Sequence, residues 1–240
     1  MSETLIIERR FNGPVASGNG GWVGGALARR MPTGAVSVSL RSPPPLEREL
    51  RIAATPEAGL ELRDGSTVLA LAEPATLDLA TPSVPDLESA RAAGAMARMR
   101  ARSRAGEMAY AMCFGCGIDR HDGLGIVPGP VGEEGVVAAC WTPSADLAET
   151  DGSVRIEAVW AALDCPAGSA WSHRLNLYPS MMTVRMTAVI DAPLTAGRPY
   201  GVMGWPIERD GRKLHAGTAI FDGEGRVLAR SLQLWLLPRD

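Results

Sequence analysis

Residues 155–166 read RIEAVWAALDCP, and the order of elements around this segment decides the fold. Its apolar residues follow the i, i+3, i+4, i+7 spacing of an amphipathic helix: Ile156, Val159, Trp160 and Leu163. Alternating, strand-like segments lie before it at 136–141 and after it at 183–190, 200–206, 214–221 and 227–237. The sequence therefore predicts a central helix, from residue 155 to about 163, among antiparallel strands.

The N-terminal part of the chain repeats this order of elements. A short apolar segment at 5–7 precedes NGGWVGG at 19–25, where apolar residues recur at helical spacing up to residue 31. Strands are expected at 35–40, 50–54, 60–62 and 67–72, and Asp64-Gly65 has the signature of a hairpin turn. A strand, a helix and an antiparallel meander, present twice, predict an α+β fold in which a sheet wraps a helix.

A third helix is expected between the two halves. Residues 86–104 are rich in Ala, Arg and Met and contain no proline. Four arginines make this helix basic: Arg98, Arg100, Arg102 and Arg104. They favour a connecting helix on the surface, and the alternative is that they bind phosphate. We divide the chain into an N-terminal half (1–82), a linker helix (83–110) and a C-terminal half (111–240).

The composition excludes several classes of protein. The 240 residues are 46% apolar and 21% charged, as in globular proteins that bury a real core. A net charge of −3 argues against nucleic acid as the main partner. No apolar run reaches the roughly 18 residues of a membrane span. The N-terminus has no signal-peptide core, and four cysteines suit a reducing compartment, so we expect a cytoplasmic protein.

The cysteines raise the question of a metal. Cys113 and Cys116 have CxxC spacing, but a structural zinc site usually takes four ligands in two close pairs. Cys140 and Cys165 stand alone, and the three histidines have no ligand spacing. We therefore expect a tight turn at 113–116 and no metal. Cys165 is expected to be a small packing residue, because a nucleophilic role requires a histidine close in space.

The chain resembles double hotdog proteins of the acyl-CoA thioesterase superfamily, in which two hotdog halves are fused. The resemblance covers nearly the whole chain and is carried by NGGWVGG at 19–25, CFGCG at 113–117, VWAALDCP at 159–166 and RDGRKLHAG at 209–217. It implies a double hotdog fold and hydrolysis of an acyl thioester, either acyl-CoA or acyl-carrier protein. It implies no cofactor beyond the coenzyme A of the substrate.

The resemblance also implies a composite site. Hotdog thioesterases place a Gly-rich helix start of one half against a carboxylate on the central helix of the other. Asn19 is a favoured N-cap residue, and the free backbone N–H groups of Gly20 and Gly21 could polarise a thioester carbonyl. The first half has no carboxylate between residues 9 and 46, whereas Asp164 lies beside the apolar stripe of the second helix. We expect these parts to meet.

In this site Asp164 is expected to act as general base on a water, or as a direct nucleophile. Asn19 stands where the family often has His, so we expect it to orient the substrate carbonyl or the water. Pro166 is expected to break the helix locally and to aim Asp164 into a cleft.

Three further residues are candidates for the substrate site. Trp22 and Trp160 lie on the predicted central helices, where they could line an acyl tunnel or pack in the core. Glu157 lies seven residues before Asp164 on the same flank and is the second choice for the acid.

Two other functions stay open. A hotdog dehydratase or hydratase commonly pairs His with an acid, and no His is expected on either central helix. A non-catalytic acyl-thioester-binding protein would fit the absence of an acid in one half. The fused halves already form the unit that single hotdogs make by dimerising, so a homodimer of the whole chain is a further option.

Overall fold

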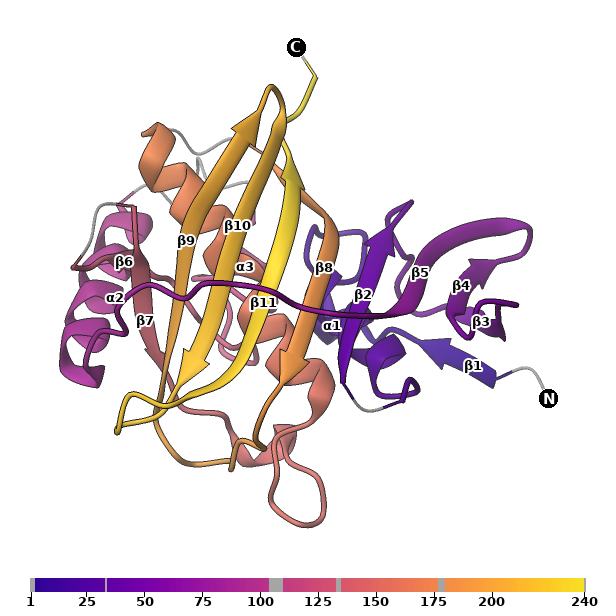
Figure 1. The fold of residues 1–240 in the computed structure, drawn as a ribbon, viewed down its shortest axis with the longest axis horizontal. Helices are drawn as coiled ribbons and strands as arrows, with labels where there is room; N and C mark the ends of the chain where they lie inside the picture. The colour runs from indigo at the N-terminus through magenta and orange to yellow at the C-terminus, as the bar shows by residue number, and fades with distance from the viewer. Residues whose placement is uncertain (1–2, 33, 104–109, 133–134, 177–179, 240) are drawn as a thin grey trace.

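In the part of the chain that the structure describes, eleven strands form one continuous antiparallel sheet, in the order β1-β3-β4-β5-β2-β8-β11-β10-β9-β7-β6 (Figure 1). We describe it from a computed structural model, for residues 3–32, 34–103, 110–132, 135–176 and 180–239. The first half supplies β1 (Glu3–Ile6), β2 (Ala35–Leu40), β3 (Glu49–Ala54), β4 (Leu60–Asp64) and β5 (Thr67–Ala75). The second supplies β6 (Gly129–Pro130), β7 (Val137–Trp141), β8 (Met182–Ile190), β9 (Tyr200–Asp210), β10 (Lys213–Phe221) and β11 (Val227–Leu236).

Each half contains one central helix, α1 (Gly20–Ala28) in the first and α3 (Ile156–Leu175) in the second. In Figure 1, α3 lies behind strands β8 to β11, while the segment 76–86 crosses in front of them. That segment leads to α2 (Leu87–Arg102), which packs against β7. The expected helix at 86–104 is therefore present at 87–102, and Arg104 lies outside the described residues. The domain boundaries at residues 82 and 110 stay a prediction.

The two halves share the sheet through the antiparallel pair of β2 and β8, with Val36 opposite Ala188 and Val38 opposite Met186. These four side chains are buried in the main core. On the alternate positions, the Thr187 hydroxyl donates to Ser37 Oγ at 3.0 Å. Since residues along a strand alternate between faces, this register gives the junction one apolar face and one polar face.

Helix α3 is much longer than the sequence predicts, and the expected break at Pro166 is wrong. The helix continues for 20 residues, with Pro166 inside it. Proline removes one helical hydrogen bond, but the segment that follows is buried under the sheet. A Cβ on Gly204 of β9 would lie 2.4 Å from the Pro166 carbonyl oxygen, so the strand packs directly on the proline. Tertiary packing of this kind outweighs a local preference against helix.

A side chain of the sheet also supports α3 near the proline. Gln233 Nε2 on β11 donates to the Leu163 carbonyl oxygen at 2.7 Å, and Trp235 Nε1 donates to Gln233 Oε1 at 2.8 Å. Gln233 is 1% exposed, so these bonds satisfy polar groups that have no access to water.

Helices α1 and α3 contact each other through glycine. A Cβ on Gly21 would lie 2.5 Å from the Trp160 carbonyl oxygen, and one on Gly25 would lie 2.5 Å from Glu157 Cα. No larger residue fits at either position without moving a backbone. The Gly-rich start of α1 therefore lets the two helices approach closely, and it brings residue 21 of one half beside residue 164 of the other.

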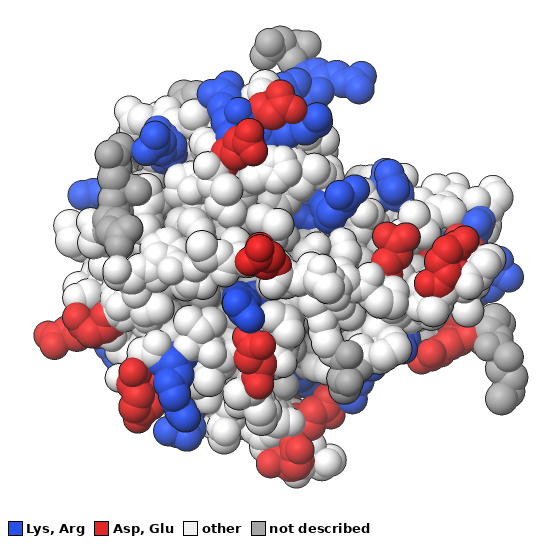
Figure 2. Space-filling model, viewed as in Figure 1, with Lys and Arg blue, Asp and Glu red and all other residues white. Residues whose placement is uncertain are grey.

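Charged side chains of both signs are interspersed over the face seen in Figure 2. Among the described residues, no helix is long and apolar enough to cross a membrane.

Candidate active site

The structure brings Asn19, Gly21 and Asp164 together, as the composite site requires. Asp164 Oδ2 accepts hydrogen bonds from Asn19 Nδ2 at 3.2 Å and from the Gly21 N–H at 3.1 Å. Asp164 Oδ1 accepts one from the Thr183 hydroxyl of β8 at 2.6 Å. The side chain is therefore held at both oxygens, by groups from both halves of the chain.

Asn19 has two structural roles at this point. Its Oδ1 accepts from the Trp22 N–H at 2.9 Å, which caps α1, and this bond turns its Nδ2 towards Asp164. The positive end of the α1 dipole then faces the carboxylate, an arrangement that stabilises negative charge. Asn19 thus holds the acid in place.

The two backbone N–H groups that were expected to bind the substrate, those of Gly20 and Gly21, differ in their hydrogen bonding. The Gly21 N–H is engaged by Asp164, whereas Gly20 lines the neighbouring cavity. Among the described residues, no group accepts a hydrogen bond from the Gly20 N–H, which belongs to the first turn of the helix. Gly20 therefore keeps a free donor beside the acid.

Burial raises the pKa of Asp164 from its ordinary value to about 6. The hydrogen bond from Thr183 acts in the opposite direction, as do those from Gly21 and Asn19. Desolvation disfavours the charged form, and these donors favour it. At neutral pH the group is therefore mainly a carboxylate, with a higher proton affinity than an exposed aspartate.

Asp164 lies on the wall of a cavity of about 680 Å³, a size typical of small-molecule sites. Apolar side chains line much of it, including Leu40, Val127, Met181, Val184 and Trp235. Basic side chains line other parts: Arg41, Arg100 and His173. The cavity thus offers an apolar surface and cationic groups in addition to the carboxylate.

The expectation that no histidine lies on a central helix is wrong, because His173 belongs to α3. The sequence places the end of α3 too early, so the residue was expected outside it. It lies nine positions after Asp164, or about 13.5 Å along the helix axis at 1.5 Å per residue. Burial lowers the pKa of His173, and the charge of Arg100 lowers it further. The two side chains do not form the adjacent His–acid pair of a dehydratase.

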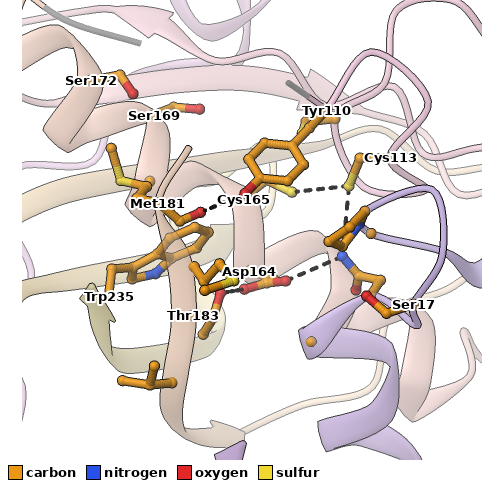
Figure 3. Close-up of a pocket in the computed structure, with 18 of the residues that line it drawn as sticks. Ser17, Tyr110, Cys113, Asp164, Cys165, Ser169, Ser172, Met181, Thr183 and Trp235 are labelled. Carbon is orange, nitrogen blue, oxygen red and sulfur yellow. Dashed lines mark hydrogen bonds between the residues drawn. The ribbon is translucent and has the colours of Figure 1, made fainter. Parts of the chain in front are cut away.

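Three thiols meet beside the acid, although the sequence pairs only two of them. Cys113, Cys116 and Cys165 all line the cavity, and Cys113 Sγ lies 3.8 Å from Cys165 Sγ (Figure 3). Asn19 Nδ2 lies 3.8 Å from Cys113 Sγ. Hydrogen bonds from the other two thiols lower the pKa of Cys113. Cys165 is therefore part of a cluster and not an isolated packing residue.

The other candidates lie away from the cavity. Trp22 stacks on Phe11 with ring centroids 3.5 Å apart, and Trp160 is 2% exposed in the main core. Glu157 pairs with Arg29 at 3.5 Å, beyond the last turn of α1. None of the three candidates is among the described residues that line the cavity. For the two tryptophans, core packing accounts for the observed positions.

Sequence reasoning missed two hydrogen-bonding residues of the cavity. Thr183 begins a predicted strand, and nothing in the sequence links it to Asp164. Tyr110, whose hydroxyl donates to the Met181 carbonyl at 3.0 Å, lies in the connection before the second half. Both contacts depend on how β8 and this connection pack on α3, which no local pattern reports.

Comparisons with known proteins support the fold. No protein-family model and no curated protein sequence matches the chain. A candidate thioesterase from Novosphingobium aromaticivorans matches in structure with a TM-score of 0.64 and 13% identity, over 98% of this chain and 95% of that one. The tesB protein of Mycobacterium avium has a TM-score of 0.58 and 14% identity, over 92% and 88%. A hot dog fold protein of unknown function from Alicyclobacillus acidocaldarius matches with a TM-score of 0.57 and 10% identity, over 99% of this chain and 93% of that one.

The chain therefore has the double hotdog fold, as the sequence predicts. One hotdog surrounds α1 and the other surrounds α3, and β2 and β8 join their sheets. Proteins named as thioesterases share this fold over nearly the full length of the chain.

Proposed function

We propose that this protein hydrolyses acyl thioesters in the cavity beside α1, with Asp164 as general base. The supporting observation is the buried carboxylate, held by Asn19, Gly21 and Thr183 on the wall of a ligand-sized cavity. A base fixed at both oxygens is oriented before substrate arrives, which is what general-base catalysis needs.

The reaction we propose starts with a water between Asp164 and the thioester carbonyl. Asp164 takes a proton from the water while the water oxygen bonds to the carbonyl carbon. The carbonyl oxygen becomes an oxyanion, for which the free Gly20 N–H at the start of α1 is the proposed donor. The carbon–sulfur bond then breaks, and the proton on Asp164 returns to the thiolate. The products are a carboxylic acid and a thiol.

This assignment refines the role expected for the helix start. Gly20 serves as the oxyanion donor, whereas Gly21 and Asn19 position the base. Direct attack by Asp164 on the carbonyl is the less favoured route, because both of its oxygens already accept hydrogen bonds. The reaction needs no cofactor beyond the coenzyme A of the substrate.

We further propose acyl-CoA as the substrate. The apolar lining around Met181 and Trp235 suits an acyl chain, and Arg41 and Arg100 suit the phosphates of coenzyme A. Among the arginines of the linker helix for which the sequence offered phosphate binding, we therefore choose Arg100, which lines the cavity. Its neighbour Arg98 instead donates a hydrogen bond to the Gly125 carbonyl. Acyl-carrier protein is the competing carrier.

The test is hydrolysis of short, long, branched and aromatic acyl-CoAs by the purified protein, followed by chromatography of the released acid. Matched acyl-carrier proteins should be run beside them. We expect turnover of at least one acyl-CoA, and Glu157→Gln, which lies away from the cavity, should leave its kcat unchanged. Turnover of the carrier-protein thioester alone would overturn the choice of coenzyme A. Binding without turnover of any thioester would overturn hydrolysis and leave the acyl-binding alternative.

A further inference from the structure

The three clustered thiols have a geometry that the proposed hydrolysis does not use. The sulfur atoms of Cys113, Cys116 and Cys165 all lie within 4.8 Å of one another. Cys113 and Cys116 come from the loop that opens the second half, and Cys165 comes from α3. Residues 49 positions apart in the sequence are thus brought to one point, at the wall of the cavity.

One of these sulfur–sulfur separations equals that of a tetrahedral metal site, and the other two lie within about 1 Å of it. With metal–sulfur bonds of about 2.3 Å, the sulfurs around zinc lie about 3.8 Å apart. Cys113 Sγ and Cys165 Sγ are 3.8 Å apart, and the remaining pairs are no wider than 4.8 Å. Closing the cluster around an ion therefore needs sulfur movements of about 1 Å or less, which side-chain rotation can supply.

We propose that Cys113, Cys116 and Cys165 bind a single thiophilic metal ion of the Zn²⁺ type, with the fourth coordination position open to the cavity. Three thiolates form a soft donor set that selects such ions over Mg²⁺ or Ca²⁺. Because all three residues line the cavity, an ion and a fourth ligand can reach the cluster from it. Along the sequence only Cys113 and Cys116 are close together, so the sequence alone does not indicate a metal site.

Neighbouring contacts fix two of the three ligands in place. The backbone N–H of Phe114 donates to the Asn12 carbonyl at 2.7 Å, and the Gly117 N–H donates to the Cys113 carbonyl at 2.8 Å. The loop is thus held on the first half while Cys165 is held on α3. An ion at this point would link the loop to the helix that carries Asp164. The proposal does not depend on the hydrolytic function.

The experiment is titration of the reduced, chelator-treated protein with Co²⁺ and then with Zn²⁺ as competitor. We expect one Co²⁺ per chain, with the thiolate charge-transfer and ligand-field absorption of a tetrahedral cobalt–thiolate site, and displacement by Zn²⁺. Cys113→Ser, Cys116→Ser and Cys165→Ser should each weaken binding by at least about 100-fold, since loss of an outer-shell partner already costs 10–100-fold. Cys140→Ser, on β7 and outside the cluster, is the matched control and should bind like the wild type.

Wild-type protein with no thiolate charge-transfer band would overturn the proposal, as would unchanged affinity in Cys165→Ser. X-ray absorption of the Zn²⁺-loaded wild type gives a readout that needs no variant to fold. We expect three sulfur scatterers at about 2.3 Å. A shell of nitrogen and oxygen alone would contradict the site.

Discussion

Replacement of Gly21 by alanine tests the contact between the two central helices. The added Cβ would lie 2.5 Å from the Trp160 carbonyl oxygen and 2.8 Å from Asp164 Cβ. Two opposing effects decide the stability of the variant. Alanine in place of glycine favours the helix by up to about 1 kcal/mol. Overpacking against a fixed backbone typically costs about 1–3 kcal/mol. Because the nearest atoms belong to buried α3, we expect overpacking to dominate.

The net loss should be about 1–2 kcal/mol, which lowers Tm by roughly 2–8 °C in a domain of this size. Differential scanning calorimetry measures it. Gly223→Ala is the control, since its Cβ would meet only Leu87 Cδ1, at 3.6 Å, and we expect an unchanged Tm. Hydrolysis should also fall in Gly21→Ala, because the Gly21 N–H is displaced from Asp164. A Gly21→Ala protein that melts at or above the wild-type temperature would refute the close approach of the helices.

Three further outcomes follow from individual contacts. Thr183→Val removes a bond to a buried carboxylate worth about 1.5–3 kcal/mol, so kcat should fall about 10–100-fold with KM unchanged, and Thr183→Ser should restore it. Gln233→Leu leaves Trp235 Nε1 unpaired, at about 1–3 kcal/mol, and removes the side-chain donor of the Leu163 carbonyl, so calorimetry should show a Tm lower by a few degrees. Arg100→Ala should raise the KM for acyl-CoA about two- to fivefold. The same variant should leave the KM for a phosphate-free N-acetylcysteamine thioester unchanged. Arg102→Ala is the control and should change neither value. An equal change for both thioesters would contradict a phosphate contact.

Much of the fold could be predicted because its signals are local. The apolar spacing from Ile156 to Leu163 locates the start of α3, and Asp64-Gly65 locates the turn between β4 and β5. The end of α3 could not be predicted in this way. Pro166 disfavours a helix locally, whereas burial against Gly204 and the bond from Gln233 act over distances that the local pattern does not contain. Because the end of α3 was expected too early, His173 was also expected outside the helix.

The site was predictable in part for a similar reason. Asn19, Gly20, Gly21 and Asp164 could be proposed because a helix cap, a Gly-rich helix start and an acid beside an apolar stripe are visible in the sequence. The structure brings Asn19 and Gly21 into contact with Asp164, and their catalytic roles stay a prediction. The contacts of Thr183 and Cys165 were not, since they arise where β8 and the 113–116 loop pack on α3. The glycines were recognised, but their part in helix–helix contact became clear only once α3 was placed against α1.

The most direct measurement compares wild-type protein with Asp164→Asn on the best thioester of the panel, recording kcat and the Kd of a non-hydrolysable analogue. Asparagine keeps the size of the side chain but cannot take a proton from water. We predict a kcat lower by about 10²–10⁴-fold, the usual contribution of a general base, with Kd changed little and the fold retained by circular dichroism. Wild-type kcat in a folded Asp164→Asn protein would contradict the assignment of Asp164 as the base.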